Sequence, residues 1–544
     1  MPGRIRLLPG LVGLAVLAAA CHSQPRAEPA PASTAWFTES ARAAGLTFTH
    51  VNGMRGGHYM TEIIGGGVAL LDYDGDGDLD VFFVQSQGAS RLFRNDFVET
   101  KRLSFTDVTG ASGITTTGYG MGAAAADFDN DGHVDLYVTS FGASQLFRNN
   151  GDGTFTDVTK RSGTEVSGWS VPATFFDYDR DGWPDLFVGT YLQYRVEDTA
   201  QCVSPSGAVD YCTPNTYRPQ QSRLFHNNRD GTFTDVTARS RIGSEYGPAL
   251  GASAADFDGD GWPDLYVAND SQPNQLWINR HDGTFTNVAL AAGVALTAEG
   301  KAEASMGVDA GDVDNDGDDD LFVTEQTGEG HNLYINDGHG AFEDQSARSG
   351  LAAASLRFTG FGAAWFDYDN DGWLDLLTVN GAVQTIQALA QARDPFPLHQ
   401  TKQLFRNLSG GRFEEVTSRA GDAFGHSDVG RGAAFGDLDN DGDTDVVVSN
   451  SNGPAQLLLN NVGNRRHWLG VVARPGARVE VRRKSGVSLW RRAHTDGSYA
   501  SSNDPRVLVG LGDSSERPTV RVTWPDGRTT EQANVDVDRY VTIR

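Results

Sequence analysis

Seven acidic loops contain the residues of this chain whose types and spacing could do chemistry. Each loop reads Asp-x-Asp-x-Asp-Gly-x-x-Asp, and the complete copies are Asp72–Asp80, Asp127–Asp135, Asp177–Asp185, Asp256–Asp264, Asp312–Asp320, Asp367–Asp375 and Asp437–Asp445. Carboxylates at alternate positions can converge on one hard cation, and the glycine permits the sharp turn that brings them together. The recurrence therefore predicts seven cation sites rather than a merely solvated acidic surface.

Calcium is the predicted ion. Donor sets made only of oxygen favour Ca²⁺ over zinc or copper, and the small octahedral shell of Mg²⁺ is poorly served by such a loop. We expect the side chains at positions 1, 3, 5 and 9 to bind, together with the backbone carbonyl at the variable position 7. The predicted ligands are Asp72, Asp74, Asp76, Asp78, Asp80, Asp127, Asp129, Asp131, His133, Asp135, Asp177, Asp179, Asp181, Trp183, Asp185, Asp256, Asp258, Asp260, Trp262, Asp264, Asp312, Asp314, Asp316, Asp318, Asp320, Asp367, Asp369, Asp371, Trp373, Asp375, Asp437, Asp439, Asp441, Asp443 and Asp445.

Position 12 of each loop excludes an EF-hand. That motif needs flanking helices and a bidentate Glu at position 12. Here the position holds residues typical of strands, namely Phe83, Val138, Val188, Val267, Val323, Thr378 and Val448. Thrombospondin-type and dockerin-like repeats share the loop but not the strands between copies. The ions are therefore expected to be structural, each tying a loop at the start of a strand.

The elements that must position these loops are short strands. The best-preserved unit has a small-residue run before the loop, a β-branched and aromatic run after it, and then a pair of runs such as Gln145–Thr159. Alternating runs separated by Asn, Asp and Gly are typical of antiparallel strands, and no sustained helical period is present. Four strands per unit predict an all-β fold, a seven-bladed β-propeller over residues 36–462.

The two ends of the repeat region complement each other. The seventh unit stops at Leu457–Asn460 without its last strand, whereas Trp36–Ser40 has the form of that strand with no blade before it. We expect the N-terminal strand to complete the seventh blade, which closes the ring without a free sheet edge.

Two insertions break the repeat, at residues 190–222 and 381–402. Long loops on a rigid scaffold often carry binding function. Cys202 and Cys212 lie in the first insertion, and in an exported protein a disulfide between them is predicted. The sequence leaves open whether this insertion covers the axial channel of the propeller or projects from its rim.

The first 35 residues predict export. Arg4 and Arg6 precede an apolar run that ends in small residues and Cys21. Residues 1–20 have the form of a lipoprotein signal peptide and are too short for a confident membrane span. Cys21 is the predicted lipidation site, and residues 21–35, rich in Pro and Ala, would be a tether. We expect a lipoprotein of the outer membrane or cell surface, or, if an ordinary signal peptidase cleaves here, a periplasmic or secreted protein.

Charge divides the rest of the chain. Residues 36–462 contain 26 Lys and Arg against 61 Asp and Glu, a net charge of −35, whereas residues 463–544 contain 15 against 9, a net charge of +6. Alternating runs such as Trp468–Ala473 and Thr519–Trp524 predict a small C-terminal β domain over residues 463–544. This basic domain could dock on the acidic ring, meet an anionic surface or present a solvated face. A net charge of −27 argues against nucleic-acid binding.

With these motifs placed, residues 36–462 resemble the FG-GAP/VCBS repeats of integrin α-subunit propellers. More closely, the chain is similar to bacterial members of the cartilage acidic protein family, which end in an ASPIC/UnbV module. The stretches that carry the resemblance are Phe48–His50, Tyr59–Asp80, Tyr211–Pro214, Ser305–Val308, His467–Leu469, Gly497–Tyr499, Asp504–Arg506, Gly510–Gly512 and Val522–Gly527. The resemblance implies calcium binding and an extracytoplasmic setting, and no established reaction. The chain departs from the family between Val472 and Val479, where a longer hairpin is usual.

The leading hypothesis is a calcium-stabilised module that binds a protein or glycan at the bacterial envelope. The alternative is an exported enzyme acting on a carbohydrate or similar substrate, with His50, His58, Glu62 or Arg431 as candidate catalytic residues; a third is a scaffold subunit of an envelope complex. Position −6 before each loop is mostly apolar, and only Arg431 is charged there. Nucleophile-elbow, phosphate-loop and haem-attachment motifs are absent from the sequence.

Overall fold

The computed structural model describes residues 3, 35–484, 486 and 488–543, so the predicted signal peptide, Cys21 and nearly all of the tether lie outside the described residues. Ala35–Arg544 forms one compact unit. Among the helices of the described part of the chain, we find none with the length and apolar character needed to cross a membrane.

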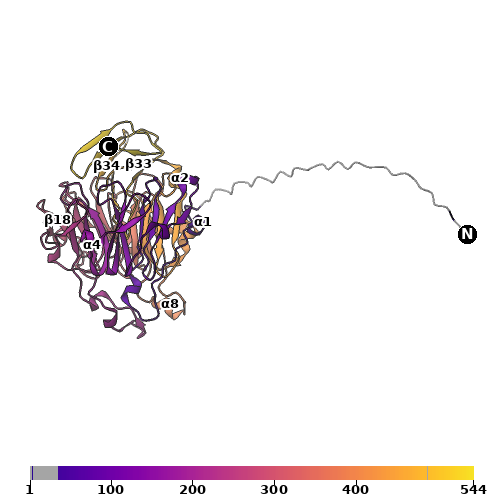
Figure 1. The fold of residues 1–544 in the computed structure, drawn as a ribbon, viewed down its shortest axis with the longest axis vertical. Coiled ribbons are helices and arrows are strands. Elements are labelled where there is room, and N and C mark those ends of the chain that lie inside the picture. Colours follow the sequence, from indigo (N-terminus) through magenta and orange to yellow (C-terminus); the bar gives the residue numbers. More distant parts are fainter. Residues whose placement is uncertain (1–2, 4–34, 485, 487, 544) are drawn as a thin grey trace. The chain divides into compact units, whose positions relative to one another are not determined.

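In the described residues, five four-stranded antiparallel sheets and one eight-stranded sheet, which comprises two four-stranded units, form the larger part of this unit (Figure 1). Their first strands contact one another in a closed ring, so each four-stranded unit is one blade of a propeller. From the axis outwards the blades are β2–β5 (Val68–Leu71, Asp80–Phe83, Arg91–Asn95, Phe105–Asp107), β6–β9 (Tyr119–Ala126, Asp135–Ala143, Gln145–Asn149, Phe155–Asp157), β10, β11, β14 and β15 (Ser167–Phe176, Asp185–Thr190, Arg223–Asn227, Phe233–Asp235), β16–β19 (Ala249–Ala255, Asp264–Asn269, Gln275–Asn279, Phe285–Asn287), β20–β23 (Val308–Gly311, Asp320–Val323, Asn332–Asn336, Phe342–Asp344), β24, β25, β27 and β28 (Gly360–Phe366, Asp375–Asn380, Gln403–Asn407, Phe413–Glu415), and β30, β31, β32 and β1 (Gly430–Gly436, Asp445–Asn450, Gln456–Asn460, Phe37–Glu39).

The N-terminal strand closes the ring, as predicted. β1 pairs antiparallel with β32, with Phe37 opposite Asn460, and forms the outer edge of the seventh blade. Phe37 is almost fully buried and packs against Phe366 and Phe424. Blades two and three are additionally joined, because β10 pairs with the end of β7 at Ser167 and Ala143.

Short helices and small sheets fill the connections. In the described residues the α-helices have four or five residues each: α1 (Ala41–Ala44), α2 (Phe97–Thr100), α3 (Thr109–Ser112), α4 (Thr159–Ser162), α5 (Ala289–Ala292), α6 (Ser346–Ser349), α7 (Leu351–Ser355), α8 (Gln387–Gln391) and α9 (Thr417–Ala420). Two two-stranded sheets belong to the connections, formed by β12 and β13 (Cys202–Val203, Val209–Asp210) and by β26 and β29 (Gln400–Thr401, Ser427–Asp428).

The C-terminal part is all-β with its own apolar core, which includes Leu469, Val479 and Val520. One sheet has the order β36, β33, β39 and the other the order β35, β34, β37, β38. The strands are β33 (His467–Val472), β34 (Arg478–Arg482), β35 (Leu489–Arg492), β36 (Val507–Gly512), β37 (Thr519–Thr523), β38 (Thr529–Gln532) and β39 (Tyr540–Thr542).

A segment of the C-terminal part, Asp496–Asn503, fills the centre of the propeller; we call it the axial plug. Its backbone and side chains bond to the first strand of every blade: Val68 and Leu70, Ala123 and Ala125, Thr174, Ala254, Val308, Ala363, and Ala433 and Phe435. Each first strand has a free edge towards the axis, and buried N–H groups on such an edge need acceptors. The plug supplies them, so the basic C-terminal part docks on the ring.

Small residues of the first strands make room for the plug. A Cβ on Gly67 would lie 2.1 Å from the carbonyl oxygen of Ala500. Below this level Tyr499 is fully buried and donates a hydrogen bond of 2.8 Å to the carbonyl of Ile64. The mostly apolar ring predicted from the sequence is therefore filled by side chains, and the cavity beside Leu250, Met306 and Phe361 has a volume of only about 40 Å³.

The two insertions cover the opposite end of the axis, at the bottom of Figure 1. Tyr211 and Cys212 are buried in one cluster with Met60, Met306 and Phe361. The insertions also bond to each other, because the backbone N–H of Thr385 donates to the carboxylate of Asp210. The first insertion thus covers the axis, and it contains the predicted disulfide between Cys202 and Cys212.

Candidate metal centres

Each acidic loop connects the first strand of a blade to the second. Position 9 opens the second strand opposite the last residue of the first, as in the pair Ala255 and Asp264. The glycine at position 6 has a positive φ in every loop, for example 88° at Gly261. Such a backbone strongly favours glycine, which explains its recurrence.

The loop is organised by its own carboxylates. In loop 4 the two oxygens of Asp256 accept hydrogen bonds from the N–H groups of Asp260 and Gly261, at 3.0 and 2.9 Å. Asp260 in turn accepts from the N–H of Trp262. The same three bonds recur in all seven loops. They fix the orientation of the carboxylates of positions 1 and 5.

Position 9 joins this cluster while bracing the loop. Asp264 accepts from the N–H of Phe257 through one oxygen and from the N–H of Asn279 through the other, and the other six blades repeat the pair. An ionised carboxylate retains acceptor capacity beyond two such bonds. Ligand atoms lie within 4.8 Å of one another in groups that could hold a metal ion, including Asp72 with Asp74 and Asp80, and the corresponding residues of loops 2 and 3.

The donor set fits a cation. Buried carboxylate oxygens without a hydrogen-bond partner point to a missing positive charge, and loops 2, 3, 5 and 7 each have one at position 3: Asp129, Asp179, Asp314 and Asp439. Burial raises the pKa of Asp135 to about 8, with the negative charge of Asp129 contributing, and burial raises that of Asp312 to about 7. Such carboxylates resist ionisation at neutral pH unless a cation compensates their charge.

A ring of asparagines was missed by the sequence reasoning. The Asn that ends each third strand donates from its side chain to the carbonyl of position 2 in the preceding blade's loop; Asn279, for example, reaches Tyr178 at 2.7 Å. The seven are Asn95, Asn149, Asn227, Asn279, Asn336, Asn407 and Asn460. Each also donates its backbone N–H to the position-9 Asp of its own loop. The signal was the Asn that recurs in every Leu-aromatic-x-Asn or related run.

Neighbouring loops are also linked directly. Asn130, Asn315 and Asn370, at position 4, each donate to the position-6 carbonyl of another loop, those of Gly182, Gly372 and Gly442. Asn440 of loop 7 donates to the side chain of Asp78 in loop 1, which carries the link across the closure of the ring. The candidate metal centres are therefore joined through side-chain contacts around much of the ring.

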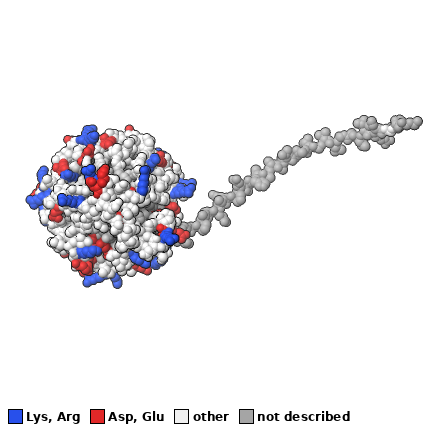
Figure 2. Space-filling view, turned by 90° about the horizontal axis from the view of Figure 1, so that it is seen from below, with Lys and Arg blue, Asp and Glu red and all other residues white. Residues whose placement is uncertain are grey.

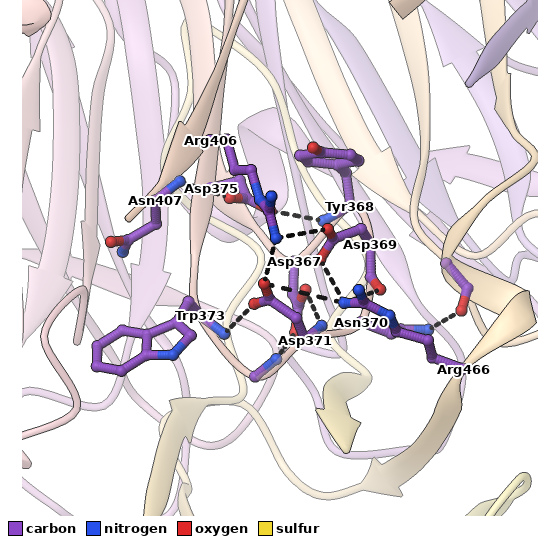
Figure 3. A network of polar contacts seen from close by, with 12 residues as sticks. Asp367, Tyr368, Asp369, Asn370, Asp371, Trp373, Asp375, Arg406, Asn407 and Arg466 are labelled. Atoms are coloured by element: carbon purple, nitrogen blue, oxygen red, sulfur yellow. Dashed lines mark hydrogen bonds and ion pairs between the residues drawn. The ribbon is translucent and has the colours of Figure 1, made fainter. Parts of the chain in front are cut away.

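The residue before the Asn that ends each third strand lies beside the acidic loop, and its type differs between blades. In blade 6 Arg406 reaches Asp371 at 3.1 Å and Asp369 at 3.4 Å, and Arg466 also contacts Asp369 (Figure 3). In blade 2 Arg148 contacts Asp129 and Asp131 in the same way. The corresponding residues of blades 1, 3, 4, 5 and 7 are Arg94, His226, Ile278, Ile335 and Leu459.

The C-terminal part lies on the loops. Tyr540 donates from its hydroxyl to Asp437 at 2.8 Å, and Arg506 donates to the backbone carbonyl of the same residue. Arg180 of loop 3 donates to the carbonyl of Pro525. The environment of several candidate metal centres thus includes residues from outside the repeats.

Two of the candidate catalytic residues have all their polar groups engaged by the protein. His50 is buried between the backbone N–H of Asn452 and the hydroxyl of Ser86, and burial, followed by the charge of Arg431, lowers its pKa to about 3. Arg431 is fully buried, donates to the carbonyls of Ile63, Gly381, Gly430 and Ala382, and lies over the ring of Phe361.

The other two candidates meet at the base. The hydroxyl of Tyr211 donates to the carboxylate of Glu62 at 3.0 Å, and the ring of His58 packs edge-on against Tyr211 at 5.1 Å. Burial raises the pKa of Glu62. The structure therefore brings His58 and Glu62 together through the first insertion, and places His50 and Arg431 in the packed interior.

Comparison with known proteins agrees with this architecture. The family model described as FG-GAP-like repeat matches residues 72–138, 127–188, 207–267, 256–323, 312–378 and 399–448, and the model described as ASPIC and UnbV matches residues 472–544. Cartilage acidic protein 1 of Homo sapiens is 26% identical over 492 residues, which are 85% of this chain and 69% of that protein. The Mus musculus protein is 26% identical over 497 residues, 86% of this chain and 71% of its own.

Among solved structures, Saccharomyces cerevisiae Sqt1 is similar with a TM-score of 0.39 and 10% identity, covering 72% of this chain and 95% of its own. An Agrocybe aegerita lectin that recognises non-reducing terminal N-acetylglucosamine has a TM-score of 0.37 and 16% identity, covering 64% of this chain and 79% of its own. By its repeats the chain belongs to the FG-GAP-like repeat family, it ends in an ASPIC and UnbV domain, and it is homologous to cartilage acidic protein 1.

Proposed function

We propose that this protein is a calcium-stabilised binding or adhesion module that acts outside the cytoplasm as a lipoprotein of the bacterial envelope. The observation that carries the proposal is the sevenfold recurrence of one loop geometry that gathers carboxylates, with buried oxygens that lack hydrogen-bond partners in loops 2, 3, 5 and 7. Bound Ca²⁺ would neutralise these carboxylates and fix the start of each second strand. The ions are then structural, and recognition of a partner belongs to the surfaces that differ between repeats.

The insertion face is the surface we assign to the partner. It consists of residues 190–222 and 381–402, and Figure 2 views the molecule from this side, where a broad uncharged area has charged side chains grouped around it. The apolar side chains Val203, Val209 and Phe396 are exposed there, at 66%, 54% and 57%. The disulfide and the bonds between the insertions hold this face rigid, which lowers the entropy lost on binding.

A protein is the favoured partner class. Exposed aliphatic and aromatic side chains surrounded by polar residues are typical of protein interfaces, whereas a glycan site needs a denser set of hydrogen-bonding groups. The packed axis and the engaged polar groups of His50 and Arg431 favour a binding role over the alternative of an exported enzyme. A glycan partner, or a scaffold role within an envelope complex, would appear as a different outcome of the same binding experiments.

The first test is metal content and its effect on stability. Purified chain without the signal peptide should bind about seven Ca²⁺ per molecule by titration calorimetry, and EDTA should lower the melting temperature strongly. At 100 times the dissociation constant, each independent site adds about 2.7 kcal/mol to the free energy of unfolding. A melting temperature that EDTA leaves unchanged would refute the proposal.

The second test addresses the partner. Crosslinking on intact envelopes should join the wild-type chain to a defined protein, and Phe396→Asp combined with Val203→Asp should abolish that product. Leu290→Asp provides the matched control, since Leu290 is exposed on the propeller outside both insertions. Equal crosslinking by all three chains would place the binding surface elsewhere, and binding to isolated polysaccharide but not protein would favour the glycan reading.

A further inference from the structure

One candidate metal centre has an imidazole beside the carboxylates at positions 3 and 9 of its loop. In blade 3 the residue that faces the loop is His226, on β14. Its Nδ1 lies 3.4 Å from a carboxylate oxygen of Asp179 and 3.2 Å from one of Asp185. His226, Asp179 and Asp181 form a group whose ligand atoms all lie within 4.8 Å of one another.

The Nδ1 atom of the imidazole faces the carboxylates of Asp179 and Asp185. Nδ1 of His226 is buried without a hydrogen bond of acceptable geometry, and one oxygen of Asp179 is buried and unpartnered beside it. The ring is held by Tyr178, whose side chain packs edge-on against it at 6.1 Å. Arg229 binds the outer oxygen of Asp181 at 2.6 Å, which fixes that carboxylate.

The spacing suits a small divalent ion. Zinc binds histidine nitrogen and carboxylate oxygen at about 2.0–2.2 Å, so two donors of a tetrahedral site lie about 3.4 Å apart. The separation of 3.4 Å between Nδ1 and the carboxylate oxygen of Asp179 agrees with this value. Imidazole is a preferred ligand of zinc and other late transition metals, whereas Ca²⁺ takes oxygen donors.

We propose that the loop of blade 3 is a transition-metal site, of the zinc class, in which Nδ1 of His226 binds the ion together with the carboxylates of Asp179 and Asp181. At the position of His226 the other six blades have an Arg, Ile or Leu; in blade 4 a different imidazole, that of His281, contacts the carboxylate of Asp260 at 2.6 Å. One residue thus changes the selectivity of one site in a ring of otherwise similar loops. This inference rests on the proposed function of the loops as cation sites.

The chain offers its own matched variants. His226→Ile installs the residue that blade 5 has at this position, and Ile335→His installs the imidazole beside the loop of blade 5. The mature chain, saturated with millimolar Ca²⁺, is titrated with Zn²⁺ by calorimetry and with Co²⁺ by visible absorption. We expect the wild type to bind one equivalent of Zn²⁺ and to give ligand-field bands with Co²⁺.

His226→Ile should weaken Zn²⁺ binding by about 100-fold or more and abolish the Co²⁺ bands, while Ile335→His should bind a second equivalent. Melting curves in Ca²⁺ confirm that each variant is folded. Absence of Zn²⁺ binding by the wild type, or an unchanged Co²⁺ spectrum in His226→Ile, overturns the inference. Calcium stoichiometry is measured on the same samples. If the wild type binds Ca²⁺ but no Zn²⁺, this inference is refuted; if it binds neither metal, the proposed function is refuted as well.

Discussion

Removal of the Tyr499 side chain should show whether the axial plug unites the C-terminal part with the propeller. Tyr499 is fully buried on the axis, packs edge-on against Phe361 with ring centroids 4.7 Å apart, and donates its hydroxyl to the carbonyl of Ile64. Tyr499→Ala deletes this ring and leaves a cavity among side chains from several blades, which cannot collapse because the ring is closed.

The expected loss follows from burial. Truncation of a fully buried aromatic side chain to Ala lowers the free energy of unfolding by about 3–5 kcal/mol. Tyr499→Phe keeps the ring and removes only the donor to Ile64, so we expect a loss of about 1–2 kcal/mol from one unsatisfied buried carbonyl. Tyr246→Ala is the control, since Tyr246 is 52% exposed and a surface change of this kind stays within about 0.5 kcal/mol.

Calorimetry in saturating Ca²⁺ measures both the loss of stability and whether the propeller and the C-terminal part melt in one transition. If the plug couples the two parts, the wild type melts in one transition and Tyr499→Ala lowers that transition as a whole. The reasoning is refuted if Tyr499→Ala and Tyr246→Ala have equal effects, because the side chain at residue 499 would then contribute no packing to the axis.

Three further outcomes are expected. Asn279→Ala should lower the free energy of unfolding by about 2–4 kcal/mol, because it leaves the carbonyls of Tyr178 and Pro263 without a hydrogen-bond donor. Urea unfolding measures this loss, with Asn150→Ala at an exposed position as the control. Equal losses in the two variants would contradict the role given to the asparagine ring. Burial alone would raise the pKa of Asp496, but the charges of Arg492 and His494 lower it to about 2 from an ordinary value of 3.8. The ionised Asp496 carboxylate therefore contributes about 2–3 kcal/mol to the free energy of unfolding, which is fully present above pH 4 and lost as the pH falls towards 2. The difference in unfolding free energy between wild type and Asp496→Asn should accordingly shrink between pH 4 and 2. It should stay constant between pH 5 and 7. Arg148→Leu, which installs the residue type of blade 7, should tighten Ca²⁺ binding at loop 2 about two- to fivefold by removing a half-exposed positive charge from Asp129 and Asp131; weaker binding in a competition titration would show that Arg148 organises the loop instead.

The sequence by itself predicted the repeat, the seven loops and the closure of the ring. Each of these is local or periodic. The alternation of apolar residues specifies a strand wherever it occurs, and the glycine at position 6 of each loop has the positive φ that its recurrence indicates. The pairing of Phe37 with Asn460 could be inferred because the two ends of the repeat region each lack what the other supplies.

Contacts between blades could not be predicted from local or periodic patterns in the sequence. The seven asparagines are part of the repeat motif, but their hydrogen-bond acceptors belong to the preceding blade. The acceptor lies 76 residues earlier for Asn149 and 101 residues earlier for Asn279. His226 contacts the loop of its own blade, but an insertion separates it from Asp185 in the sequence, so the contact forms only once β14 pairs with β11.

The C-terminal part shows the difference most clearly. Its strands and its positive charge could be predicted from the sequence, but the position of Asp496–Asn503 on the axis could not. A run of small and polar residues has no periodicity from which its neighbours in the fold could be predicted. Only the tertiary structure decides that these residues supply acceptors and donors to seven strand edges at once. Periodic side chains specify the elements and the loops between them, whereas the ends, the insertions and the plug acquire their roles from what the closed ring places beside them.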